Sequence, residues 1–182
     1  MNVPFNVNLE NKVVVITGGT AGIGKASAEA FLAEGCKVVV CGRSEAKLKA
    51  FRAEYEGHDI LAVQADVASF DDMRRLAEAA ENTFGGIDVW VNNAGMYPAG
   101  DLEDMELDTW HDTFRVNVDG VLYGCRAAIP AMRRRGGGVI LNAGSYAVIT
   151  PTANRGAYAI SKAAVHQLTR VLAAELGPDN IR

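Results

Sequence analysis

The sequence predicts a doubly wound α/β fold, in which one parallel sheet lies between two layers of helices (α/β/α). Five short apolar segments alternate along the chain with segments of helical periodicity. The apolar segments are rich in valine and isoleucine and show little polar alternation, which is typical of strands covered on both faces. Right-handed crossovers then give the strand order 3-2-1-4-5. The length of 182 residues fits a single domain over residues 1–182.

The first half of the chain supplies three strand–helix units. The first strand covers residues 12–17 (KVVVIT), and a glycine-rich turn leads from it into a helix that Gly35 ends. Ser44 is suited to cap the helix after the second strand. The other elements expected here are strands at 37–41 and 59–64 and helices at 45–55 and 70–84.

The second half supplies two more strands and two long helices. We expect strands at 87–91 and 139–142, and helices at 107–135 and 156–177. The helix at 107–135 contains Pro130 but shows no convincing break before it. The chain stops at Arg182, before any strand to which the last helix could cross back. We therefore expect a domain that is incomplete at its C-terminus, with strand five at an open edge.

Composition and charge exclude several classes of function. The chain is 49% hydrophobic and 22% charged, as in ordinary soluble proteins, and its net charge of -4 gives no reason to expect nucleic acid. The three cysteines have no CxxC spacing, so neither a disulfide framework nor a metal site is expected. The start lacks the apolar run of a signal peptide, and no segment approaches the ~18 apolar residues of a membrane span. We expect a cytoplasmic protein without membrane association.

Glycines and polar residues gather where the predicted strands end. In a doubly wound sheet this edge binds the ligand, and the turn at 17–24 can hold a pyrophosphate on backbone amides. Its spacing is GxxxGxG, not GxGxxG. Each cluster also has a structural interpretation, since Asp66 could cap a helix and Asn92 could belong to a turn. Their coincidence favours a dinucleotide site. The clusters are Gly42 and Arg43, Asp66 and Val67, Asn92 and Asn93, and Ser145.

Arg43 indicates which dinucleotide is bound. An acidic residue about twenty positions beyond the glycines would hold the ribose 2′-hydroxyl of NAD, and this chain has Gly42 and Arg43 there. Arginine can pair with a 2′-phosphate through two charge-assisted hydrogen bonds. NADP(H) is therefore favoured and NAD(H) remains possible. The alternative is that Arg43 stacks on the adenine or faces water.

Tyr158 and Lys162 suggest acid–base chemistry. On one helix they lie one turn apart on the same face, so the ammonium lies near the phenol. A neighbouring positive charge favours the phenolate and lowers the pKa of a tyrosine, each unit corresponding to roughly 1.4 kcal/mol. Ser145, thirteen residues before Tyr158, could hold a developing alkoxide by a hydrogen bond. The alternative is an ordinary surface pair on a helix.

Taken in order, these motifs resemble the short-chain dehydrogenase/reductase family, in its single-domain oxidoreductase branch with a Rossmann-type fold. The resemblance runs from Lys12 to the end of the chain. It implies that Tyr158 is the catalytic acid or base and that Lys162 assists it and binds the nicotinamide ribose. It further implies that Ser145 binds the substrate oxygen and that Asn117 helps hold a proton-relaying water chain. The implied cofactor contacts are Gly18, Thr20, Gly22, Ile23, Gly24, Arg43, Asp66, Val67, Asn92, Ala94, Gly95, Tyr158 and Lys162.

The resemblance implies an NAD(P)-dependent oxidoreductase that interconverts an alcohol and a ketone or aldehyde. It also implies a small-molecule substrate and a homodimer or homotetramer formed through the helices at 107–135 and 156–177. Family members continue beyond the equivalent of Arg182 into further strands and a substrate lid. A catalytically silent dinucleotide-binding or partner-binding fragment is therefore the alternative. An adenosyl-methionine methyltransferase would want an acidic residue near position 42 and would not use the helix that carries Tyr158.

Overall fold

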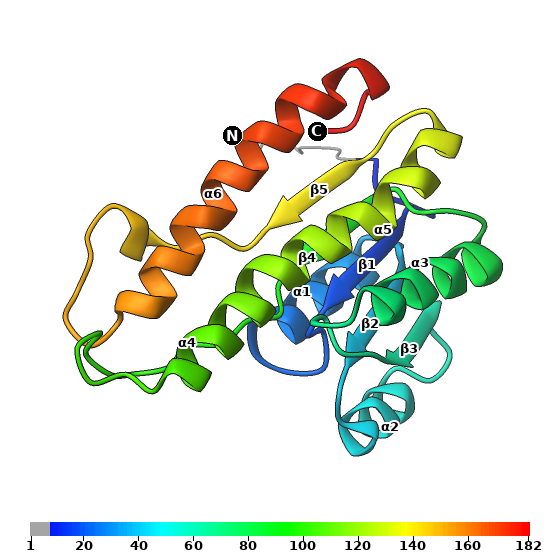
Figure 1. The fold of residues 1–182 in the computed structure, drawn as a ribbon. Helices are drawn as coiled ribbons and strands as arrows, with labels where there is room; N and C mark the ends of the chain where they lie inside the picture. The colour runs from blue at the N-terminus through cyan, green and yellow to red at the C-terminus, as the bar shows by residue number, and fades with distance from the viewer. Residues whose placement is uncertain (1–7) are drawn as a thin grey trace, which may run out of the picture.

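Five parallel strands form one sheet in the order β3-β2-β1-β4-β5, as predicted (Figure 1). The structure is a computed structural model that describes residues 8–182. Residues 1–7, where no signal peptide is expected, lie outside the described residues. The strands are β1 (Val13–Thr17), β2 (Lys37–Gly42), β3 (Ile60–Gln64), β4 (Val89–Asn92) and β5 (Val139–Asn142).

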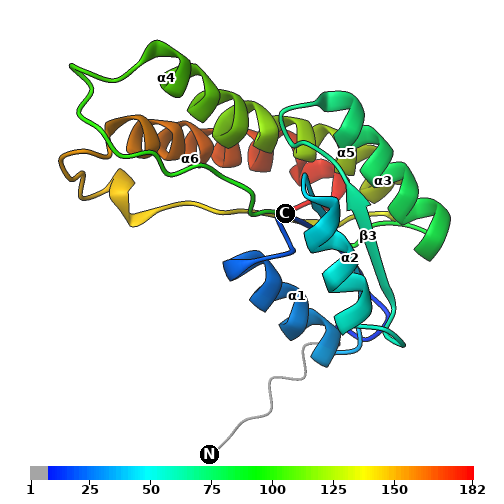
Figure 2. The same cartoon turned by 90° about the horizontal axis from the view of Figure 1, so that it is seen from below.

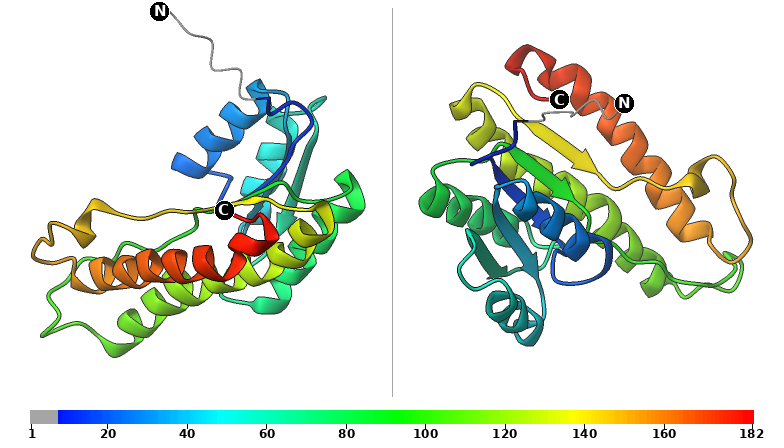
Figure 3. Two further views of the ribbon diagram at one scale, coloured as in Figure 1. Left: turned by 90° about the horizontal axis from the view of Figure 1, so that it is seen from above. Right: turned by 180° about the vertical axis from the view of Figure 1, so that it is seen from behind.

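Helices cover both faces of the sheet. Figure 2 and the left view of Figure 3 show α1 and α2 on one side and α3, α5 and α6 on the other. The helices are α1 (Gly22–Ala33), α2 (Glu45–Glu54), α3 (Phe70–Phe84), α4 (Leu107–Phe114), α5 (Gly120–Arg135) and α6 (Gly156–Leu176). Within residues 8–182, none of the helices is long and apolar enough to cross a membrane.

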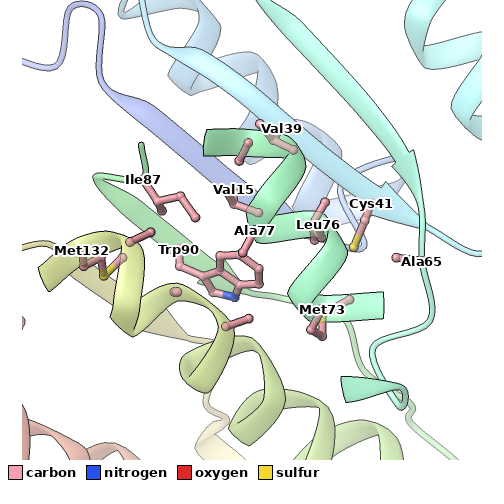
Figure 4. Close-up of a cluster of buried hydrophobic side chains, with 14 of the residues drawn as sticks. Val15, Val39, Cys41, Ala65, Met73, Leu76, Ala77, Ile87, Trp90 and Met132 are labelled. Carbon is pink, nitrogen blue, oxygen red and sulfur yellow. The ribbon is translucent and has the colours of Figure 1, made fainter. Parts of the chain in front are cut away.

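Alternating side chains of the central strands divide the core into two parts. Val15 and Val39 point toward α3 and α5, where Trp90 is fully buried (Figure 4). Val14 and Val38 point the other way, toward α1 and α2. Side chains on successive strand residues face opposite sides of a sheet, so a strand without polar alternation buries both of its faces.

Several ends of the elements follow local sequence chemistry. The Ser44 side chain accepts a hydrogen bond from the backbone N–H of Lys47 and caps α2, as predicted. Gly85 and Gly136 end α3 and α5 in the left-handed conformation. Predicted and observed ends otherwise agree to within two residues.

The prediction of one unbroken helix over 107–135 is wrong at its centre. A π-helical turn (Arg115–Asp119) separates α4 from α5. Asn117 lies in this turn, and its side chain bonds to the backbone of Met96 in a neighbouring loop. Single π-helical turns of this kind inside α-helices are rare and frequently lie at functional sites. Pro130 remains inside α5.

The expectation that strand five has an open outer edge is wrong in part. Ile181 forms a parallel bridge with Gly138. Ile140 N–H donates to the Arg182 carbonyl at 2.8 Å, and Arg182 N–H donates to the Gly138 carbonyl at 3.0 Å. A 3-10 turn (Gly177–Asp179) after α6 turns the chain back beside β5 (Figure 1). The last two residues therefore pair with some of the backbone N–H and C=O groups on the outer edge of β5.

Candidate functional site

A cleft of about 460 Å³ lies at the carboxyl ends of the first four strands. Its volume lies within the usual range for small-molecule sites, about 300–1,000 Å³. Of the predicted cofactor contacts, it is lined by Gly18, Thr20, Arg43, Asp66, Val67, Ala94 and Gly95. The other lining residues are Ala21, Cys41, Gly42, Ser44, Lys47, Ala65, Asn93, Met96 and Val116.

The glycine turn is fixed against the end of β4. Gly18 has a φ of +66°, and a Cβ there would lie 3.1 Å from the Cα of Ala94. The hydroxyl of Thr17 accepts hydrogen bonds from the backbone N–H groups of Asn93 and Ala94, at 3.0 and 3.1 Å. The side-chain amide of Asn93 donates to the backbone carbonyl of Thr17 at 2.9 Å. These contacts join the glycine turn to the end of β4 at the floor of the cleft.

The first turn of α1 meets this cleft without a side-chain cap. Its N-cap residue is Ala21, which lines the cleft and has no polar side-chain atom. The first backbone N–H groups of a helix have no partner within the helix, and they carry the positive end of its dipole. Such an end suits a phosphate group.

Two cations lie at the far end of the cleft, where β2 leads into α2. Arg43 was predicted there, and sequence reasoning missed Lys47. Lys47 is the third residue of α2, immediately after the cap that Ser44 forms. The spacing from Ser44 could have indicated that Lys47 lies in the first helical turn, on the same strand end as Arg43.

Asp66 is held in place by the start of α3. Its carboxylate accepts a hydrogen bond from Ala68 N–H at 3.0 Å, while Ser69 caps the helix. Its backbone N–H donates to the carboxylate of Asp72 at 2.9 Å. That bond, together with the hydroxyl of Ser69 and the charge of Arg75, lowers the pKa of Asp72 below its ordinary value. Asp66 therefore forms a turn before α3 and still lines the cleft.

Tyr158 and Lys162 lie on one face of α6, next to the inner end of the cleft. The ammonium of Lys162 is 5.8 Å from the centre of the Tyr158 ring. Lys162 is buried and donates to the Ala143 carbonyl at 2.7 Å, and burial lowers its pKa. A Cβ on Gly95 would lie 3.8 Å from this ammonium. Neither Tyr158 nor Lys162 lines the cleft itself, but Gly95 does, so the Lys162 ammonium lies directly behind its wall.

Asn117 joins the π-helical turn to the loop after β4 and to α6. Its side-chain oxygen accepts from Met96 N–H at 2.7 Å, and its amide donates to the Met96 carbonyl and to the Ser161 hydroxyl, both at 3.0 Å. Ser161 in turn donates to the Tyr158 carbonyl at 2.7 Å. The side chain of Asn117 thus bonds to protein atoms, and it fixes the backbone on both sides of the cleft's inner end.

Ser145 follows β5, as predicted, and caps a short helical turn (Tyr146–Val148). Its hydroxyl oxygen accepts from Ala147 N–H at 3.1 Å. A hydroxyl that accepts one bond still has its own proton to donate. Ser145 is half-buried and therefore within reach of solvent or a small molecule.

Six predicted cofactor contacts do not line the cleft, namely Gly22, Ile23, Gly24, Asn92, Tyr158 and Lys162. Asn92 is buried under the sheet edge, where it bonds to Trp90 and Asn142. Ile23 is 81% exposed at the start of α1. Gly22 and Gly24 shape the turn, since a Cβ on Gly24 would collide with the Gly18 carbonyl oxygen.

Comparison with known proteins gives matches along almost the whole chain. The family model described as short chain dehydrogenase matches residues 12–182. An uncharacterized oxidoreductase of Staphylococcus aureus (strain USA300) is 34% identical over 174 residues, which cover 96% of this chain and 75% of the relative. A 3beta-hydroxysteroid dehydrogenase 1 of Eggerthella lenta is 41% identical over 179 residues, which cover 96% of this chain and 69% of the relative.

A solved structure has the same arrangement of elements. It is the apo form of LigO from Sphingobium sp. strain SYK-6, with a TM-score of 0.91 and 29% sequence identity. The match covers 96% of this chain and 66% of that one. This chain therefore spans roughly two thirds to three quarters of the length of these proteins.

Proposed function

The chain belongs to the short-chain dehydrogenase family, and from that membership we propose that it interconverts an alcohol and a ketone or aldehyde with NADP(H) as the hydride carrier. The observation that supports the proposal is the pairing of Tyr158 with the buried Lys162, whose ammonium lies close to Gly95 in the wall of the cleft. A phenol beside a cation is suited to proton transfer at a substrate oxygen.

The residues that line the cleft fit a dinucleotide phosphate. Gly18 lines the cleft without a side chain and packs too closely on Ala94 to carry one, and the first N–H groups of α1 have no side-chain cap. A pyrophosphate would be held there by backbone donors and by the helix dipole. Asp66 and Val67 line the same cleft and would contact the adenine end.

Each group near the inner end has a distinct task in this proposal. When bound, the cofactor supplies or accepts the hydride at the reacting carbon. In the direction of reduction, the Tyr158 hydroxyl gives its proton to the substrate oxygen, and in oxidation it takes the proton back. The Ser145 hydroxyl donates a hydrogen bond to that oxygen. Lys162 supplies the neighbouring positive charge, and Asn117 holds the backbone around it.

Two cations support a preference for NADP(H) over NAD(H). Arg43 and Lys47 both line the end of the cleft after β2, and among residues 8–182 no acidic side chain lines that end. A 2′-phosphate would be bound by both cations, whereas a 2′-hydroxyl would leave them without an anionic partner.

The proposed substrate is a secondary alcohol or ketone with an apolar body. Large exposed apolar side chains occur in the two loops that flank Tyr158, namely Tyr97, Leu102, Tyr146 and Ile149. Exposed apolar groups that gather around a site commonly contact an apolar ligand. The name of the Eggerthella lenta relative adds a 3β-hydroxysteroid to the compounds worth testing.

The test is equilibrium binding of NADPH and NADH to the purified chain, read from nicotinamide fluorescence. We expect tighter binding of NADPH, weakened about tenfold by Arg43→Ala or Lys47→Ala, with little change for NADH. Lys49→Ala is the matched control, because Lys49 lies on the same helix and does not line the cleft. A folded chain that binds neither nucleotide would refute the proposal.

A second measurement separates an enzyme from a silent binding fragment. Turnover of a panel of ketones and 3β-hydroxysteroids should be abolished by Tyr158→Phe, while NADPH binding is retained. Binding without turnover in the unaltered chain would favour the fragment. The homodimer or homotetramer and the cytoplasmic location stay predictions, and sedimentation of the complete protein tests the first of them.

A further inference from the structure

The loop between β4 and α4 is fastened to the start of α6. Gly100 forms a parallel bridge with Arg155, and its N–H donates to the Asn154 carbonyl at 3.1 Å. Leu102 packs against Gly156, the first residue of α6, where a Cβ would lie 2.5 Å from the Leu102 side chain. Two segments far apart in the sequence are therefore joined into one unit beside Tyr158.

Within this unit, Tyr97 lies between a cation and Tyr158. The rings of Tyr97 and Tyr158 are perpendicular, with centres 4.4 Å apart. The guanidinium of Arg155 lies over the Tyr97 ring, 4.1 Å from its centre. Perpendicular aromatic pairs and cations over ring faces are both attractive arrangements. We call these three side chains the Arg155–Tyr97–Tyr158 stack.

Without such contacts, nothing in the local sequence would fix Tyr97. Its side chain is 58% exposed, and an exposed aromatic ring on a loop ordinarily changes rotamer freely. The stack restricts it, since Arg155 is itself anchored by the backbone pairing with Gly100. The ring of Tyr158 then has a fixed neighbour in addition to Lys162.

We propose that Tyr97 is a positioning residue, which holds the ring of Tyr158 in the orientation needed for proton transfer, and that Arg155 holds Tyr97. This inference rests on the proposed function, because it requires Tyr158 to be the acid or base. Small displacements of a reacting group lower rates steeply. The ring of Tyr97, and not its hydroxyl, carries the effect.

The first arm of the test is kinetic. Tyr97→Leu should lower kcat roughly tenfold with KM for NADPH changed less than about twofold, because Tyr97 does not line the cofactor cleft. Tyr97→Phe is the matched control, and it should keep kcat within about twofold since it keeps the ring. Arg155→Gln should lower kcat by about threefold. Unfolding midpoints of the variants show whether a loss is merely structural.

The second arm does not depend on turnover. The chain is labelled with 3-fluorotyrosine, and the fluorine resonance of Tyr158 is identified by its absence in Tyr158→Phe. Loss of the neighbouring ring in Tyr97→Leu should shift this resonance, and Tyr97→Phe should leave it near its original place.

The outcomes distinguish the inference from the proposed function. Unchanged kcat and an unchanged resonance in Tyr97→Leu, with an active unaltered chain, overturn the inference alone. A fall in kcat as large in Tyr97→Phe as in Tyr97→Leu also overturns it, because the hydroxyl would then carry the effect. An unaltered chain that binds NADPH but turns over no substrate overturns the proposed function, and the inference with it.

Discussion

Replacing Asn117 by alanine should remove the connection that holds the inner end of the cleft together. The side chain is fully buried and makes three hydrogen bonds, two to the backbone of Met96 and one to Ser161. Asn117→Ala leaves these groups without that partner. It also leaves an empty volume where the amide stood.

The expected cost follows from how well water can replace the lost bonds. Met96 is half-buried, so its backbone groups can be partly hydrated. Ser161 is fully buried but keeps its bond to the Tyr158 carbonyl. A buried polar group that loses its partner costs about 1–3 kcal/mol, so three partly compensated losses amount to about 3 kcal/mol. This is a large part of the stability of a small domain.

Urea unfolding followed by tryptophan fluorescence, to which Trp110 and the buried Trp90 both contribute, measures this free energy. Thr113→Val is the control, because Thr113 is equally buried on the same helical run but donates only to the Thr109 carbonyl within α4. It should cost less than about 1 kcal/mol. A double-mutant cycle of Asn117→Ala with Ser161→Ala should give a coupling of about 1 kcal/mol. A loss in Asn117→Ala no larger than in the control would refute the reasoning.

Three further predictions concern the core and the strand ends. Gly124→Ala should lower the free energy of unfolding by about 2 kcal/mol and Tm by about 6 °C, because the added Cβ would collide with Asn92. Asp72→Asn should cost about 1 kcal/mol at pH 7 through its weakened bond to Asp66 N–H. The pKa of Asp72 in the folded chain lies below its ordinary value of 3.8. The stability difference between Asp72→Asn and the unaltered chain should therefore fade as the pH falls from 3.8 through the folded-state pKa. Burial raises the pKa of Cys41 to about 12, so its thiol should react with an alkylating reagent far more slowly in the folded chain than in urea.

Each of these has an outcome that contradicts it. A Gly124→Ala variant with unchanged Tm would mean that α5 moves away from β4 at little cost. For Asp72→Asn, a stability difference that stays constant down to pH 2 would exclude a lowered pKa as its source. Rapid alkylation of Cys41 in the folded chain, read by mass spectrometry with Cys125 as the buried comparison, would show that the end of β2 opens readily.

Some parts of the site were predictable because they depend on the local backbone. The glycine-rich turn between β1 and α1 and the cap at Ser44 are properties of a few neighbouring residues. The strand order followed from the alternation of strands and helices, since right-handed crossovers leave few alternatives. Such inferences require no knowledge of distant contacts.

Other parts depended on contacts between distant segments. The π-helical turn at Asn117 exists because its side chain bonds to a loop 21 residues earlier in the chain. Lys47 lines the cleft because α2 is oriented by its packing on the sheet. The pairing of Ile181 with β5 was not predictable from the sequence, because the two residues after the last turn form a segment too short to be recognised as a strand.

The sequence by itself determined which chemical groups reach the carboxyl edge of the sheet, because hydrophobic periodicity places the strands and whatever follows a strand lies at its end. It also placed Tyr158 and Lys162 on one helical face, because that spacing is a property of the helix. Only the tertiary structure decided what surrounds them. The burial of Lys162, the stack on Tyr97 and the burial of Asn92 under the sheet edge all arise from packing between elements that the sequence separates widely.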